Sequence, residues 1–154
     1  MIRNILTGLG IAALTTPALA APLEVISQVL VEQRVAAPDG TTRIELVTPK
    51  RVVPGDRVTY VLRYRNTGRQ PISDLVLANP LPASLTYRGP HSGSPAPELS
   101  ADGKSFGPLA GLRVAAASVS RTASTQDVTS VRWQLDQPLA AGAGGEFSFD
   151  AVVK

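Results

Sequence analysis

Few residues in this sequence could carry out catalysis. His91 is the only histidine and there is no cysteine, which excludes thiol catalysis and leaves a zinc site short of its usual ligands. Gly103 to Gly107 reads GKSFG and matches the G-x-S-x-G pattern of hydrolase nucleophiles. That pattern works where a strand turns sharply into a helix, whereas Ser105 follows an Asp-Gly turn signal. We interpret the motif as a turn, and we expect His91, in a loop of Gly, Pro and Ser, to be solvated.

Four arginines form the candidate binding feature. Arg57, Arg63 and Arg65 share the polar face of one predicted strand, and Arg132 points outward beside Trp133 in another. One interpretation is a solvated sheet face whose charges discourage edge-to-edge pairing. The alternative is a patch that binds an anionic envelope polymer, such as lipopolysaccharide or an acidic glycan. Both interpretations stay open at the level of the sequence.

The elements that position these residues are strands. Val52 to Gly68 reads VVPGDRVTYVLRYRNTG, in which Pro54-Gly55 suits a type II turn and the following residues alternate strictly between apolar and polar. Such alternation is typical of an antiparallel strand with one face in the core. Residues 23–48 predict a long hairpin turning at Asp39-Gly40. Residues 109–127 are harder to interpret: a short strand near 112–114 and a Ser/Thr-rich loop, or else a short helix.

The whole pattern predicts an all-β protein. Roughly seven to nine short strands, with turn signals about every ten residues, favour an immunoglobulin-like antiparallel β-sandwich with an extra N-terminal β-hairpin. The sequence has no cysteine, so no disulfide can join the sheets and packing alone must hold them together. Trp133 is the candidate centre of that packing. The predicted core residues are Tyr60, Leu62, Tyr64, Leu75, Leu77, Trp133, Leu135, Phe147 and Phe149.

Several segments together resemble a known bacterial family. They are VVPGDRVTYVLRYRNTG, ISDLVLANPLPASLTYRG, SADGKSF and VRWQLDQPLAAGAGGEFSF, which span about Val52 to Val153. They resemble the conserved repeat domain of exported and cell-surface proteins, also called domain of unknown function eleven. Asn79 departs from the Asp usual before Pro80, and Ala140-Ala141-Gly142 replaces the usual Pro-Gly turn. The resemblance implies an immunoglobulin-like fold and an extracytoplasmic location, and it implies no catalytic residue.

The first residues predict export. Arg3, an apolar run over 5–14 and the small residues around Ala20 have the layout of a secretory signal peptide, with cleavage after Ala20. Its removal leaves 134 of the 154 residues and lowers the formal net charge from +3 to +2. We therefore predict a signal peptide over 1–20, an N-terminal β-hairpin over 21–50 that packs on or extends the sandwich, and the repeat domain over 51–154. The predicted location is the periplasm or the extracellular medium.

These observations favour a non-enzymatic structural or protein-interaction module of the bacterial cell envelope, with no catalytic residue, cofactor or metal site. The alternative function is a binding module for an anionic polymer or glycan that uses the arginine-bearing face. A net charge of +2 is too small to predict nucleic acid as a partner. After signal cleavage we expect no transmembrane segment. The strand over 23–35 is longer than a domain edge needs, so it is also a candidate for strand-mediated self-association.

Overall fold

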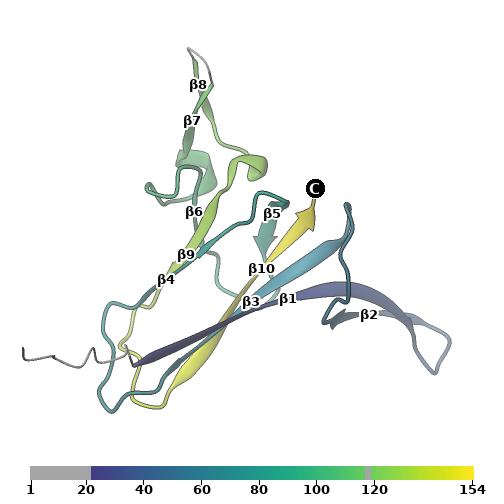
Figure 1. Ribbon diagram of the computed structural model, residues 1–154, viewed down its shortest axis with the longest axis horizontal. Helices are drawn as coiled ribbons and strands as arrows, with labels where there is room; N and C mark the ends of the chain where they lie inside the picture. Colours follow the sequence, from purple (N-terminus) through teal and green to yellow (C-terminus); the bar gives the residue numbers. More distant parts are fainter. Residues whose placement is uncertain (1–21, 117–118) are drawn as a thin grey trace, which may run out of the picture.

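The protein is built from β-strands joined by turns. The computed structural model describes residues 22–116 and 119–154, so the predicted signal peptide lies outside the described residues. Ten strands and two short 3-10 turns make up the regular structure of the described chain (Figure 1). The strands are β1 (Leu23–Ala36), β2 (Thr42–Val47), β3 (Arg57–Asn66), β4 (Val76–Pro80), β5 (Leu85–Pro90), β6 (Glu98–Ser100), β7 (Arg113–Ala116), β8 (Val119–Thr122), β9 (Ser130–Gln134) and β10 (Gly144–Val153). The prediction of an all-β protein is confirmed.

The strands form two larger antiparallel sheets and one separate hairpin. The first sheet has five strands in the order β2-β1-β3-β10-β5, and the second has three in the order β4-β9-β6. β7 and β8 pair with each other. Buried side chains from the two larger sheets join in one hydrophobic cluster, as in a β-sandwich.

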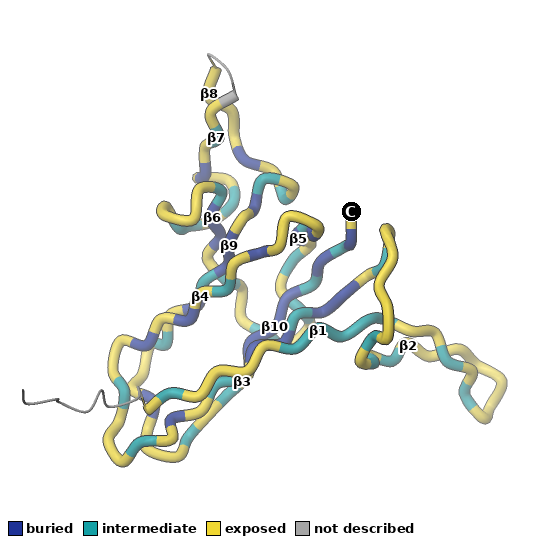
Figure 2. The backbone as a smooth tube through the Cα atoms, viewed as in Figure 1, coloured by how far each residue is buried: buried dark blue, intermediate teal, exposed yellow. Residues whose placement is uncertain are grey.

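Aromatic rings hold the two larger sheets together. Trp133 of β9 stacks on Phe147 of β10, with ring centroids 5.0 Å apart and planes 6° from parallel. The Trp133 indole N–H donates to the Pro95 carbonyl oxygen at 2.9 Å, so its polar atom has a partner in the core. Figure 2 shows the buried positions following β3, β9 and β10. Of the residues that the sequence assigned to the core, six are buried and three are half-buried and pack against them: Leu62, Leu75, Leu77, Trp133, Phe147 and Phe149, then Tyr60, Tyr64 and Leu135.

The turn at Pro54-Gly55 joins the start of β3 to the end of β10. Gly55 has a φ angle of 95°, and the Asp56 N–H donates to the Val53 carbonyl oxygen at 3.1 Å, as in a type II turn. The Asp56 carboxylate accepts a hydrogen bond from the Val53 N–H at 2.8 Å. The Gly55 N–H donates to the Val153 carbonyl oxygen, and the Val153 N–H donates to the Asp56 carbonyl oxygen. The predicted turn therefore also closes one end of the sheet.

Asn66 closes the opposite end of the five-stranded sheet. This residue is fully buried at the end of β3. Its side-chain Nδ2 donates to the carbonyl oxygens of Gln70 at 2.8 Å and Leu139 at 2.9 Å, and its Oδ1 accepts from the Gly68 N–H at 2.9 Å. The Asn-Thr-Gly segment thus fastens the turn after β3 to the connection between β9 and β10.

The N-terminal hairpin extends the five-stranded sheet. β1 has 14 residues and two partners: Leu23–Val31 pairs with β3, and Val31–Ala36 pairs with β2. These partners lie on opposite sides of β1, as the sheet order requires. The β1–β2 turn, where Gly40 has a φ angle of 82°, projects beyond the rest of the sheet (Figure 1).

Residues 109–127 differ from the single strand and loop that the sequence indicated. A 3-10 turn over Leu109–Gly111 precedes the β7–β8 hairpin, and a second over Thr125–Asp127 follows it. The base of the hairpin is fixed to the sandwich, because Leu112 and Ala123 are buried and joined by a hydrogen bond of 2.9 Å. β8 is exposed along its whole length, and the hairpin projects away from the two sheets (Figure 2).

Candidate binding face

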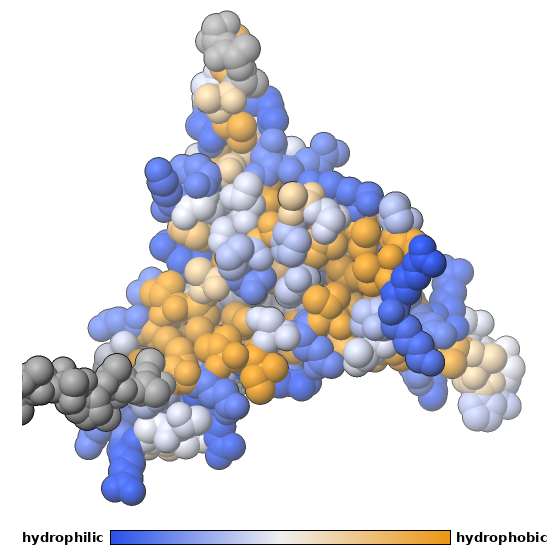
Figure 3. All heavy atoms as spheres, viewed as in Figure 1, coloured by the Kyte–Doolittle hydropathy of each residue, from blue (hydrophilic) through white to orange (hydrophobic). Residues whose placement is uncertain are grey.

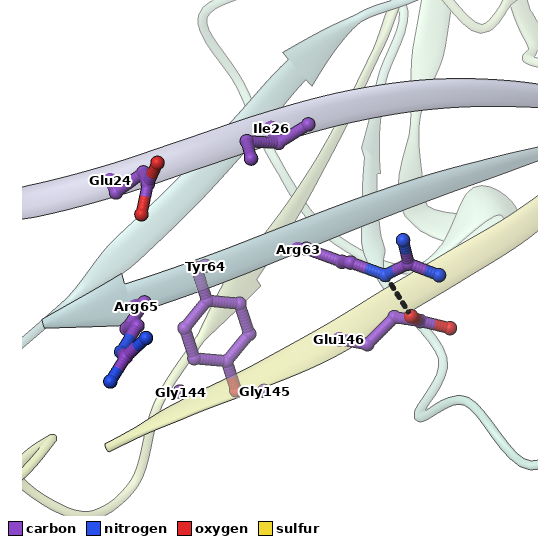
Figure 4. Close-up of a pocket in the computed structure, with 8 residues that line it drawn as sticks. All are labelled: Glu24, Ile26, Arg63, Tyr64, Arg65, Gly144, Gly145 and Glu146. Carbon is purple, nitrogen blue, oxygen red and sulfur yellow. Dashed lines mark hydrogen bonds and ion pairs between the residues drawn. The ribbon is translucent and has the colours of Figure 1, made fainter. Parts of the chain in front are cut away.

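A hollow of about 440 Å³ lies on the five-stranded sheet, where β1, β3 and β10 run side by side (Figure 4). We call it the outer hollow. Two cross-strand rows on this face of the sheet border it. The residues of each row face one another in register: Glu24, Arg65 and Gly144 in the first, and Ile26, Arg63 and Glu146 in the second. Its full lining is Glu24, Ile26, Arg63, Tyr64, Arg65, Gly144, Gly145 and Glu146.

Gly144 places no side chain on the outer hollow, and its neighbour Gly145 faces the core side of the sheet, where the Tyr64 ring lies against Phe147. Gly144 and Gly145 begin β10 beside Tyr64 and Arg65 of β3. A Cβ atom at Gly144 would collide with the Tyr64 carbonyl oxygen, and one at Gly145 would collide with the Tyr64 hydroxyl. A side chain at Gly144 would therefore push β10 away from the backbone of β3, and one at Gly145 would displace the Tyr64 ring. The glycine-rich segment, which the sequence indicated only as a turn, also shapes this surface.

Charges of both signs border the outer hollow. The Arg63 Nε donates to the Glu146 Oε2 at 2.8 Å across the β3–β10 pair. Arg65 is exposed and lies opposite Glu24, and among the described residues it forms no ion pair. Ile26 adds an apolar wall and is 53% exposed. Among the described residues the hollow therefore offers a guanidinium and a carboxylate that form no ion pair, beside apolar surface, which suits a polypeptide better than a uniformly charged polymer.

The structure separates the four arginines that the sequence grouped. Arg57, Arg63 and Arg65 lie on the same face of β3, but Arg57 is at the opposite end of the strand, about 20 Å from Arg63 at the usual rise per residue. Arg132 lies on the other sheet, on the side of β9 opposite the buried Trp133. Its guanidinium binds the Glu98 Oε2 at 2.6 and 2.8 Å and stacks over the Phe106 ring. Only Arg63 and Arg65 of the four border the outer hollow.

His91 is more enclosed than the sequence indicated. Its side chain is 30% exposed, and its Nδ1 hydrogen-bonds to the Asp150 Oδ1 at 2.8 Å. The same carboxylate oxygen accepts the hydroxyl of Thr59, a residue with no exposed surface, at 2.8 Å. The prediction of a solvated His91 is wrong, because the loop after β5 folds against β10 and donates the His91 N–H to the Ser148 carbonyl oxygen. Nothing in the sequence joins these distant residues: the pairing of β10 with β3 brings Thr59 to Asp150, and its pairing with β5 brings His91 there.

Ser105 lies in a turn and not beside a histidine partner. Its hydroxyl donates to the Asp102 Oδ2 at 3.0 Å. The Asp102 Oδ1 accepts the backbone N–H groups of Lys104 and Ser105 and the hydroxyl of Ser100. These hydrogen bonds favour the carboxylate, the two backbone donors most strongly, and hold the pKa of Asp102 well below its usual range. Asp102 therefore organises the turn, and Ser105 is one of its donors.

Comparisons with protein-family models, with curated proteins and with solved structures gave no match to this chain. Within residues 22–116 and 119–154, no three His, Asp or Glu side chains come close enough together to hold a metal ion. The helical turns of the same residues are too short to cross a membrane.

Proposed function

We propose that this chain is a non-enzymatic, exported structural or protein-interaction module of the bacterial cell envelope, built as a single immunoglobulin-like conserved repeat domain with an added N-terminal hairpin. The residues that carry the family resemblance support this assignment, because their contacts hold the fold together. The Pro-Gly-Asp segment joins β3 to β10, Asn66 fastens two turns, and Trp133 packs between the sheets. Each of these motifs maintains the fold, as expected for a family defined by packing.

The outer hollow is the observation that supports an interaction role most directly. It combines an exposed Ile26, an Arg65 that forms no ion pair among the described residues, and the bare backbone of Gly144 on an otherwise regular sheet face. Bare backbone beside an apolar side chain accommodates an extended peptide, and the charges at the rim can orient it. The partner proposed here is therefore a protein of the same compartment, the periplasm or the extracellular medium, as the N-terminal signal predicts.

Site-specific photocrosslinking in living cells tests this role. A photoreactive phenylalanine analogue replaces Arg65 in the outer hollow, and a control variant carries it at Gln134, which is exposed on β9 of the other sheet. We expect covalent adducts with a protein from position 65 and none from position 134. Absence of adducts at position 65, or equal adducts at both positions, contradicts the proposal. The mass of each adduct also distinguishes a second copy of this chain from a different protein.

The alternative function, binding of an anionic polymer or glycan, is favoured by one specific observation. Arg65 and Arg57 are exposed on the same sheet face without an ion pair among the described residues. Both guanidinium groups are thus free to bind phosphate or carboxylate groups. Against it stand Glu24 and Glu146, which place negative charge beside the same hollow.

A further inference from the structure

Along the first half of β1, one edge has no strand partner within the part of the chain that the structure describes, and two hydrogen bonds show which backbone groups face it. The Thr67 N–H donates to the Pro22 carbonyl oxygen at 2.8 Å, so Pro22 directs its backbone toward the β3 side. The Ala37 N–H donates to the Thr41 carbonyl oxygen at 2.7 Å, so Ala37 directs its backbone toward the β2 side. Because backbone groups alternate along an antiparallel strand, even-numbered residues of β1 bond to β3 and odd-numbered residues face the β2 side.

β2 does not cover this side completely. Its pairing with β1 begins at Val31, so the N–H and C=O groups of the preceding odd-numbered residues have no strand partner among the described residues. These residues are Leu23, Val25, Ser27 and Val29, which present eight backbone groups in all. Unpaired strand edges of this kind are templates for pairing with another strand.

This edge lacks the features that protect other sheet edges. β4 ends with Pro80 and β6 has only three residues, whereas Leu23–Leu30 contains no proline, no lysine and a single charge, at Glu24. Apolar side chains are exposed on both faces of the edge: Val25 is 44% exposed on one, and Ile26 is 53% exposed on the other. In the space-filling view, hydrophobic residues gather between β4 and the beginning of β1 (Figure 3).

We propose that the occupant of this edge is a second copy of the chain, paired antiparallel through β1 about a two-fold axis at Ile26. In this register Val25 pairs with Ser27 of the second copy and Leu23 pairs with its Val29, which satisfies all eight free backbone groups of each chain. A two-fold axis at Ser27 would leave Leu23 opposite Val31, whose backbone already bonds to β2. The edge residues therefore select the register centred on Ile26.

The side chains are self-complementary in the same register. Ile26 packs on Ile26 of the second copy, which covers an exposed apolar side chain on each chain. Glu24 lies opposite Gln28 of the second copy, so no like charges face each other. The two five-stranded sheets become one continuous sheet. This inference names a partner for the proposed interaction role and rests on that role only in placing an interaction surface at β1.

Sedimentation velocity on the protein purified after export from the bacterial periplasm tests the dimer. We expect the wild-type protein to sediment as a dimer and Ser27→Pro to sediment as a monomer with an unchanged circular dichroism spectrum. Proline removes an N–H that faces the free edge and leaves the bonds to β3 intact. Ser27→Ala keeps that N–H and remains dimeric. A wild-type protein that stays monomeric at millimolar concentration overturns the proposal and leaves the edge to a strand of a different protein, which the photocrosslinking at Arg65 detects separately.

Cysteine crosslinking tests the register, even if Ser27→Pro fails to fold. The chain has no cysteine of its own. Opposed residues that are not hydrogen-bonded have Cα atoms about 4.5 Å apart, which is within the range of a disulfide. We expect Ile26→Cys to form a disulfide-linked dimer on oxidation. Glu24→Cys and Gln28→Cys are matched controls: each alone gives no crosslink, and the two mixed together crosslink. Crosslinking by Glu24→Cys alone, or none by Ile26→Cys, overturns the proposed pairing.

Discussion

At the scale of single residues, the buried Asn66 side chain joins the turn after β3 to the connection between β9 and β10. We expect Asn66→Ala to lower the free energy of unfolding by about 2–4 kcal/mol, because it removes three hydrogen bonds and strands buried backbone groups. Asn66→Asp should be at least as harmful, since a carboxylate cannot donate to the carbonyl oxygens of Gln70 and Leu139. Urea unfolding measures both variants. Asn79→Ala is the control, because its side chain makes one exposed bond to Pro80; equal losses at both positions would show that Asn66 has no special role.

The Asp102 carboxylate makes the stability of the fold depend on pH. Its pKa is lower in the folded state than the ordinary value of about 3.9, so it stabilises the fold above that value. This stability is lost as the pH falls from about 4 through the lower folded-state pKa. We expect Asp102→Asn to melt below the wild type at neutral pH, and the difference in melting temperature to shrink progressively under acid conditions. Thermal melts from neutral pH to below pH 3 measure it. A difference that stays constant over this range would rule out the carboxylate as its origin.

Local turns could be predicted from the sequence, whereas side-chain contacts between distant segments could not. The turn at Gly55 was predictable, because proline followed by glycine specifies its own backbone angles. The bond of Asn66 to the Leu139 carbonyl oxygen and the contact of His91 with Asp150 were not, because these partners lie 73 and 59 residues away in the sequence. Only the assembled sheet brings these groups together.

At the scale of elements, alternation predicted the strands that have one face in the core. β3 and β10 were found in this way, because their apolar residues point toward the opposite sheet. β8 was missed, since all four of its residues are exposed and no alternation marks it. β1 was recognised as a strand, but the free edge of its first half depends on the order β2-β1-β3, which a hydrophobic pattern does not encode.

The strand β9 is the element whose packing can be tested most simply. Trp133→Ala should lower the free energy of unfolding by about 3–5 kcal/mol, because it removes the ring that stacks on Phe147 and leaves a cavity. Trp133→Phe keeps an aromatic ring but loses the bond to the Pro95 carbonyl oxygen, so we expect a smaller loss. Thermal melts and urea titrations measure both. No destabilisation in Trp133→Ala would contradict the central position of this strand.

At the scale of the whole molecule, the charge distribution distinguishes the two functions. The sequence grouped Arg132 with the arginines of β3, because each alternates outward from its own strand. In the fold, however, Arg132 lies on the sheet opposite to β3 and binds Glu98. A polymer therefore cannot contact all four arginines on one sheet face, and on the outer hollow it can contact only Arg63 and Arg65.

A binding assay with matched variants follows from this separation. If an anionic polymer is the ligand, replacing Arg63 and Arg65 together with serine should abolish retention on immobilised lipopolysaccharide, because it removes both guanidinium groups and leaves Glu146 unpaired at the hollow. Arg132→Ser, on the opposite sheet, should leave retention unchanged. Retention should also weaken as salt is raised, since exposed charges are screened. Unchanged retention after the double substitution would rule out the outer hollow as the polymer site, and the partner photocrosslinked at Arg65 would then identify what the hollow binds.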